Sequence, residues 1–384
     1  MMRSRLACVI VACLWPLVAL AGEPGSARKL NPDLLKLPAN TWVHIRPARN
    51  PVARSYSGIC HGEGLIYYFG GGHGSYPCND VELYDVATNT WTQATEPEDW
   101  RQADSWTHLT PEERKHVRNI GGGSGVALLS PKGRPLTRHT YQMQCYFPEE
   151  KAFFTSMDQL WAFDPSASLR AGPAKRDWRK VMDKAPRGRD VHTWNLTYDP
   201  DLKTLVSVVV GGPDRAVYVF DRDKTKWSKR CDVPVTAWSE VYSTYDASRR
   251  LHTVRAGKRW WTLDMATGTT RFIADLGEAW MKAKGRDKPP RTESVSIEYD
   301  PESARTLVLF KGDGTELWAY EADKDAWSEV KMAGEPPKGT TDWDLLVYDP
   351  DHKCFLFLNV LGVQDSARAD GLFAFRCQRV EERR

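Results

Sequence analysis

The chain lacks several features that would assign it to a common functional class. Its 53 basic and 50 acidic residues nearly cancel, and no concentrated basic run occurs, so no nucleic-acid-binding surface is predicted. No Cys-x-x-Cys pair is present, which argues against a zinc cluster. The glycine-rich segment 121–125 has neither the lysine nor the strand-to-helix context of a phosphate-binding loop. Beyond the amino-terminal segment, no apolar run is long enough to span a bilayer.

The first 21 residues have the pattern of a secretory signal peptide. Arg3 and Arg5 precede an apolar run, and Ala19-Leu20-Ala21 fits the small-x-small cleavage rule. The run is too short to favour a membrane anchor. We therefore expect an exported protein, secreted or periplasmic, whose mature chain, residues 22–384, forms a single domain. In an oxidising compartment some of its six cysteines should pair.

What the chain has in excess is aromatic residues, with 16 Trp and 14 Tyr, and they recur in a repeat. Each unit has a strand ending in Tyr-Asp-Pro or a similar turn, a second apolar strand, a third strand with an aromatic residue and an aspartate, and then a Trp. Clear copies span residues 191–227 and 292–327, and further copies begin at residues 138, 238 and 341. The first copy includes residues 65–91. The segments alternate apolar and polar residues or run apolar between turn residues, as strands do.

The last copy lacks its Trp strand, and the segment 40–45, with Trp42, is an isolated strand that can complete it. Such pairing closes a ring and removes the open sheet edge. The repeat, with double glycines at Gly70-Gly71 and Gly211-Gly212, resembles the kelch-repeat β-propellers, the group that includes galactose oxidase. The resemblance implies an all-β propeller of six four-stranded blades closed by an amino-terminal strand. A seventh blade within residues 93–136 stays open as an alternative.

Two segments do not fit the repeat and are interpreted as insertions, at about residues 93–136 and 276–290. The first contains a predicted helix, with Thr110 as N-cap, Pro111 at the first helical position and Glu113 closing a capping box. If the strands of a blade are named A to D from the centre outward, both insertions connect strand D to the next strand A. They therefore rise from one face, here called the top face, which suggests a walled cleft there.

Three histidines are expected at the mouth of this face. His73 follows strand B of the first blade, while His139 and His192 open strand A of the second and third blades. A single histidine at the start of strand A is more often structural than functional. Three from consecutive blades favour a functional site.

The composition of this mouth resembles that of propeller-type polysaccharide lyases. Such an enzyme neutralises a uronate carboxylate, removes the C5 proton and protonates the leaving oxygen. His192, Tyr141 and His139 are the candidate catalytic residues: His192 or Tyr141 takes the proton, while His139 helps to hold the carboxylate. The candidate substrate-binding residues are Arg138, His73, Trp194, Glu293 and Trp343. Arg138 pairs with the carboxylate, and the two tryptophans stack on sugar rings. The expected partner is an acidic polysaccharide or oligosaccharide bound by a monomer, with no nucleic acid and no membrane.

Other functions stay open. A non-catalytic kelch propeller would bind a glycan or a protein through the same face, since fold alone does not fix function. A glycoside hydrolase would need two carboxylates, and Glu240 and Glu293 lie a blade apart. A copper oxidase like galactose oxidase would need a Cys beside a Tyr, but Cys60 and Cys145 fall on the opposite face. The cofactor is unknown, and a divalent metal at the three histidines is not excluded by their chemistry.

Two disulfides are expected from the strand positions of the cysteines. Cys354 opens strand B of the last blade and Cys377 closes its strand C, so their ends should meet. Cys60 and Cys145 end strand A in adjacent blades and form a second candidate pair.

Overall fold

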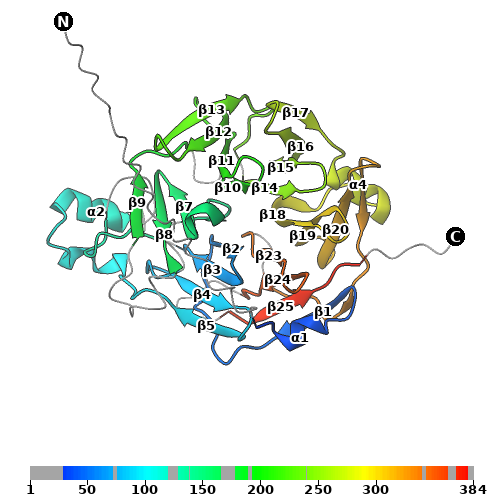
Figure 1. The fold of residues 1–384 in the computed structure, drawn as a ribbon, viewed down its shortest axis with the longest axis horizontal. Coiled ribbons are helices and arrows are strands. Elements are labelled where there is room, and N and C mark those ends of the chain that lie inside the picture. Colours follow the sequence, from blue (N-terminus) through cyan, green and yellow to red (C-terminus); the bar gives the residue numbers. More distant parts are fainter. Residues whose placement is uncertain are drawn as a thin grey trace, which may run out of the picture.

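The computed structural model describes residues 29–71, 76–119, 129–137, 139–165, 178–188, 193–238, 240–339, 343–361 and 369–378. Six antiparallel sheets stand around a central axis like the blades of a propeller (Figure 1). The innermost strand of each sheet contacts the innermost strands of both neighbours, so the ring is closed. The predicted all-β propeller with six blades is confirmed, and the described residues contain no seventh blade.

The blades follow one another in chain order, each from its inner to its outer strand. Blade 1 comprises β2 (Gly58–Gly62), β3 (Leu65–Phe69), β4 (Glu82–Asp85) and β5 (Thr90–Gln93). Blade 2 comprises β6 (Gln144–Phe147), β7 (Ala152–Met157), β8 (Gln159–Phe163) and β9 (Trp178–Met182). Blade 3 comprises β10 (Thr197–Asp199), β11 (Thr204–Val209), β12 (Ala216–Asp221) and β13 (Lys226–Cys231).

The second half of the ring has the same plan. Blade 4 comprises β14 (Val241–Asp246), β15 (Leu251–Ala256), β16 (Arg259–Asp264) and β17 (Thr269–Phe272). Blade 5 comprises β18 (Arg291–Asp300), β19 (Arg305–Lys311), β20 (Thr315–Glu321) and β21 (Ala326–Glu329). Blade 6 comprises β23 (Leu346–Asp349), β24 (Cys354–Leu358), β25 (Leu372–Phe375) and β1 (Thr41–Ile45), with the short β22 (Ala333–Gly334) outside β1.

The Tyr-Asp turns of the repeat fix the connections between strands A and B. The Asp199 side chain accepts hydrogen bonds from the backbone N–H groups of Asp201 and Leu202, at 2.9 and 2.8 Å. Asp246 does the same for Ser248 and Arg249. An aspartate that bonds the backbone two and three residues ahead holds a tight turn without any other partner. The recurring aspartate is therefore a turn-forming residue in these blades.

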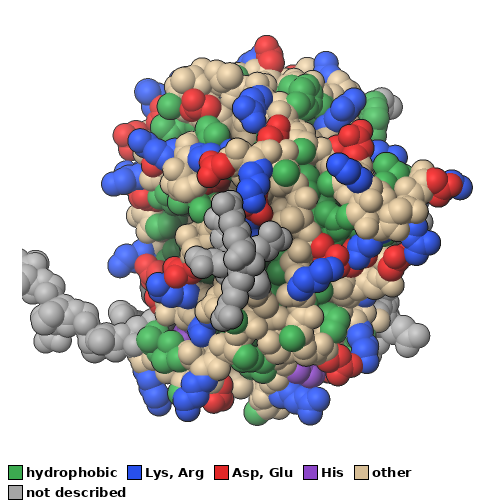
Figure 2. All heavy atoms as spheres, turned by 90° about the vertical axis from the view of Figure 1, so that its right-hand side faces the viewer, with side chains coloured by type: hydrophobic (Ala, Val, Ile, Leu, Met, Phe, Trp, Pro, Cys, Tyr) green, Lys and Arg blue, Asp and Glu red, His purple; other side chains and the backbone are tan. Residues whose placement is uncertain are grey.

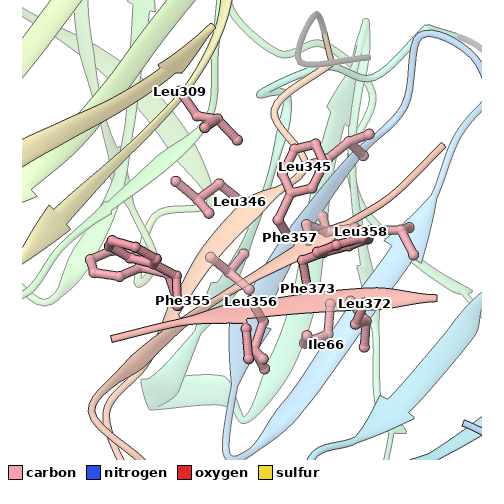
Figure 3. Packing of buried hydrophobic residues seen from close by; sticks show 14 of the residues in the cluster. Ile66, Leu309, Leu345, Leu346, Phe355, Leu356, Phe357, Leu358, Leu372 and Phe373 are labelled. Carbon is pink, nitrogen blue, oxygen red and sulfur yellow. The ribbon is translucent and has the colours of Figure 1, made fainter. Parts of the chain in front are cut away.

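The amino-terminal strand closes the ring as predicted. β1 is antiparallel to β25, with Trp42 opposite Phe375, and the two rings lie 4.8 Å apart. Trp42 is 4% exposed and belongs to a buried cluster that joins three blades. Figure 3 shows part of this cluster, where Ile66 of blade 1 and Leu309 of blade 5 flank the aromatic and leucine side chains of blade 6. Closure thus contributes core packing as well as backbone pairing.

Both insertions contain helices, and the helix of the second insertion packs against β21 of blade 5. The helix α2 (Pro111–Asn119) begins with the predicted capping box, because the Glu113 N–H donates to Thr110 Oγ1 and the Thr110 N–H donates to Glu113 Oε2. It contacts η1 (Trp100–Ser105). The second insertion forms α4 (Leu276–Lys284), whose Trp280 indole donates to Glu316 of blade 5. A short helix, α1 (Pro32–Leu35), precedes β1.

The outer surface mixes charges of both signs. Figure 2 shows acidic and basic side chains interspersed over the side of the ring that carries α4. Within the residues that the structure describes, no helix is long and apolar enough to cross a membrane.

The two predicted disulfides are not formed, since all six cysteines outside the first 21 residues are free thiols. In blade 6, Phe355 pairs with Phe375, which places Cys354 opposite Arg376 and one residue out of step with Cys377. Successive side chains of a strand point to opposite faces, so the two thiols point away from each other. Cys377 accordingly faces Arg305 of blade 5, at 3.1 Å. Cys60 lies on β2 and Cys145 on β6. These strands belong to different sheets, so no strand pairing sets the two cysteines opposite each other.

We expect a non-reduced digest of the protein to contain Cys354 and Cys377 as free thiols. Burial raises the pKa of both, to about 12 for Cys377, which keeps the reactive thiolate scarce. A reducing agent should therefore leave the melting temperature unchanged. The check is mass spectrometry after alkylation in denaturant, and a cross-linked peptide pair containing both residues would contradict this prediction.

Candidate functional site

Four aromatic side chains gather on the top face at the starts of three neighbouring inner strands. Tyr56 precedes β2, His139 and Tyr141 precede β6, and Trp343 precedes β23. The His139 ring is stacked on Tyr56 with centroids 4.0 Å apart, and Tyr141 meets His139 edge-on at 5.8 Å. Trp343 lies 5.6 Å from Tyr56 on the other side. These four residues are called the top-face cluster.

The backbone holds this cluster in a strained but well-bonded form. Tyr56 and Tyr141 have positive φ angles of 59° and 37°, a backbone conformation that residues other than glycine seldom adopt. The Tyr56 carbonyl accepts from the N–H groups of Thr140 and Tyr141, at 2.7 and 3.3 Å. The starts of β2 and β6 are thus bonded directly to each other, which fixes the spacing of the rings.

The double glycine of the repeat explains why the two starts can approach so closely. The Thr140 hydroxyl donates to the Phe69 carbonyl at 3.1 Å. A Cβ added to Gly70, which has φ of +116°, would lie 2.3 Å from that hydroxyl. In blade 3 the contact is within one blade, where a Cβ on Gly211 would lie 2.7 Å from the Cβ of Thr193. Gly70 therefore leaves room for the start of the neighbouring inner strand, and Gly211 leaves room for the start of the inner strand of its own blade.

Exposure divides the top-face cluster into two parts. Tyr56 and His139 are half-buried and reach the surface, whereas Tyr141 and Trp343 are 6% and 9% exposed. The accessible part of the cluster is therefore the stacked Tyr56 and His139 pair. Tyr141 contacts both rings of this pair, and Trp343 contacts Tyr56.

The remaining predicted site residues are placed less fully. His73, Arg138 and His192 lie outside the described residues, and Glu293 is located only as part of β18. Convergence of the three histidines therefore stays a prediction. Trp194 is described and lies apart from the top-face cluster: it is 3% exposed, and its indole donates to the Ser156 carbonyl at 3.3 Å. In this position it presents no face to a sugar ring.

Tyr56 is a residue of the top-face cluster to which the sequence alone assigns no role. Its signal was position alone, two residues after Arg54 at the start of the first inner strand. Arg54 itself is fully buried, bonded to Asp80 at 2.9 Å and covered by the Tyr76 ring. Because its charge is paired in the interior, Arg54 supports the loop that carries Tyr56 rather than meeting a ligand.

Below the top-face cluster, Gln142 at the start of blade 2 bonds residues of three other blades. Its side-chain oxygen accepts from the Ser243 N–H of blade 4 at 2.5 Å, and its side chain also bonds the Asp344 carboxylate of blade 6. Its own carbonyl accepts from the Leu196 N–H at 2.7 Å. Sequence alone gave no sign of this cross-link, because its partners are distant in the chain.

Comparison with known families agrees with this geometry. The model of the kelch motif matches residues 53–98, which contain all of blade 1. The chain is a kelch-repeat β-propeller. No curated protein sequence matches it.

Two solved structures are similar to this kelch propeller. A Bacteroides thetaiotaomicron structural genomics protein of unknown function is 8% identical, with a TM-score of 0.47 over 88% of this chain and 73% of that one. A chain of the nidogen/laminin complex is also 8% identical, with a TM-score of 0.43 over 74% of this chain and 81% of that one.

Two carboxyl groups of the kelch propeller lie near the axis in unusual surroundings. Burial raises the pKa of Glu298 to about 7, although hydrogen bonds from the Tyr299 N–H and the Thr244 hydroxyl oppose the shift. Burial also raises the pKa of Asp344 well above its ordinary value, and the neighbouring Glu298 charge adds to the effect. Near neutral pH this pair therefore retains protons that exposed carboxyl groups would lose.

We expect Glu298→Gln to stabilise the protein at alkaline pH. Because the pKa is higher in the folded state, that state binds more protons than the unfolded one, and stability is lost as pH rises from 4.5 to about 7. This shift corresponds to roughly 3 kcal/mol, reduced to roughly 2 kcal/mol by partial exposure of the side chain. Urea unfolding at about pH 4 and pH 8 measures the difference. Glu112→Gln, on the exposed face of α2, is the control and should show no change; an equal pH profile for Glu298→Gln and wild type would contradict the prediction.

Proposed function

We propose that this kelch propeller is an exported carbohydrate-active protein that binds uronate-containing glycans at the top face and cleaves them by elimination. The observation that carries the proposal is the packing of the His139 imidazole against two tyrosines, Tyr56 and Tyr141. Imidazole and phenol are the side chains that such proton transfers use. The signal-like first 21 residues support export.

The proposed reaction needs three chemical roles to be filled at one sugar: a base, a group that binds the carboxylate and a proton donor for the leaving oxygen. A base removes the C5 proton, the electron pair forms the C4–C5 double bond, and the C4–O bond breaks as the leaving oxygen takes a proton. His192 or Tyr141 is proposed as the base, while Arg138 and His139 hold the carboxylate. In the sequence, Arg138 directly precedes His139 and His192 directly precedes Thr193. Both therefore adjoin the segments that lead into inner strands, which supports their inclusion.

An alternative is a propeller that binds a glycan or a protein without cleaving it. The accessible stacked pair of Tyr56 and His139, packed against the buried Tyr141 and Trp343, favours this reading, since a rigid aromatic surface suffices for binding.

The deciding experiment is a panel of uronate-containing polysaccharides, assayed by the ultraviolet absorbance of unsaturated uronate, with and without a chelator. Turnover of at least one member is expected. Binding without turnover on the whole panel would favour the non-catalytic propeller, and neither binding nor turnover would refute the glycan proposal.

A further inference from the structure

A cavity lies on the axis of the propeller, on the face opposite the top-face cluster. Its volume is about 580 Å³, and inner strands from all six blades contribute to its wall. It opens between the turns that join strands A and B, where Pro148, Pro200, Pro301 and Pro350 form the rim. This volume is in the range of small-molecule sites. It is called the axial cavity below.

The wall of the axial cavity is suited to a cation. It includes the carboxyl groups of Glu298 and Asp344 and, among the described residues, no Lys or Arg. The histidine in the wall, His61, lies 3.6 Å from another carboxylate, Asp349. An acidic ligand would therefore find no Lys or Arg among the described residues of the wall to pair with.

Two buried side chains in this wall have unsatisfied polar atoms. Asp344, 8% exposed, uses its carboxylate to bond Gln142 and the Ile297 N–H, yet its Oδ1 has no hydrogen-bond partner. Gln144, 5% exposed, has no partner for either its oxygen or its nitrogen. Buried polar atoms without partners are rare and costly in folded proteins, so a group that bonds them is expected.

Glu298 stands across the same space and is only partly satisfied. Its Oε1 accepts from Thr244 and from the Tyr299 N–H, at 3.1 and 3.2 Å. The carboxyls of Glu298 and Asp344 face each other, and both face the Cys60 thiol. Asp344 also faces the phenol of Tyr242. Burial raises the pKa of that thiol and that phenol, so both stay neutral and leave the carboxyls as the charge-bearing groups.

We propose that the axial cavity binds a small aliphatic amine, with an ammonium group held between Asp344 and Glu298. An ammonium has three N–H donors, which match Asp344 Oδ1, the Glu298 carboxylate and the Gln144 amide oxygen. The methylene chain points toward the rim, where Tyr198, Tyr245, Tyr299 and Tyr348 offer aromatic surface, which also suits a second ammonium. A metal ion is a poorer match, since no group of three or more His, Cys, Asp or Glu among the described residues is arranged to hold one.

The test is calorimetric titration of the full-length protein with 1,4-diaminobutane and with spermidine, using 1,4-butanediol as the neutral analogue. Both amines should bind and the diol should not. Titrations in buffers of different ionisation enthalpy should show proton release, because the partly protonated carboxyls ionise when the ammonium enters.

Asp344→Asn and Glu298→Gln should each weaken amine binding at least about tenfold, since each removes one charge of a buried ionic contact. Both keep the shape and most hydrogen bonds of the original side chain, and Glu112→Gln is the control. If Asp344→Asn does not fold, Glu298→Gln decides alone. Absence of binding by both amines, equal binding of the diol, or unchanged affinity in a folded Glu298→Gln protein would overturn the proposal.

Discussion

Deletion of residues through Ile45 should open the sixth blade and lower the melting temperature by roughly 10 °C or more. The deletion removes β1, so that β25 becomes an unpaired edge strand. It also removes Trp42, which packs on Phe375, and Ile45, both members of the buried cluster that joins blades 1, 5 and 6. Because the ring is held by contacts between neighbouring blades, the loss is expected to reach the whole domain.

A point variant tests the same contact without deleting chain. Trp42→Ala should cost about 3 to 5 kcal/mol, as is usual for truncating a buried tryptophan. Trp238→Ala is the matched control, because Trp238 is 60% exposed and should change stability little. Thermal and urea unfolding of the three proteins give the comparison. A deletion variant that melts like the parent would refute the closing role of β1.

The second large effect is expected at the top face. If a uronate polysaccharide is turned over, His139→Ala and Tyr141→Phe should each lower kcat/KM by about 10² to 10⁴, the usual contribution of a positioned acid or base. Tyr141→Phe removes only the hydroxyl and keeps the ring that packs edge-on against His139. His192→Ala should have an effect of the same size if that residue is the base.

The control for these variants is His116→Ala, at an exposed position of α2. It should keep full activity, and all variants should melt near the wild-type temperature. Turnover that survives both His139→Ala and His192→Ala would end the catalytic assignment. Loss of glycan binding in the same variants, without turnover in the wild type, would instead support the non-catalytic propeller.

Local sequence patterns were sufficient for much of this fold. The Tyr-Asp turns and the blade tryptophans set the number of blades, and Thr110 with Glu113 located the start of α2. The pairing of β1 with β25 followed from the one strand that the last copy of the repeat lacks. The disulfide between Cys354 and Cys377 was wrong because a one-residue difference in register reverses the face, and register is not evident from composition.

The sequence predicted the face on which the candidate site residues lie, but not the contacts between their side chains. The topology placed His139 and Tyr141 on the top face, and the structure brings both against Tyr56. Neither the stacking of Tyr56 nor the bond from Ser243 to Gln142 could be predicted, because both join blades through side-chain geometry. Trp194 shows the converse problem, since a tryptophan at the start of an inner strand can be core packing instead of ligand surface.

The pairing of β1 with β25 also determines how the ring would respond to mechanical load. The two strands are antiparallel, and the backbone of Asn40 bonds that of Arg376 just outside Trp42 and Phe375. The amino end of β1 and the carboxyl end of β25 therefore leave the ring at the same edge. Tension applied between these ends would load the hydrogen bonds one after another, as in opening a zipper, instead of shearing them together. Although the buried cluster packs blades 1, 5 and 6 together, the ring should thus yield to a modest pulling force at this seam.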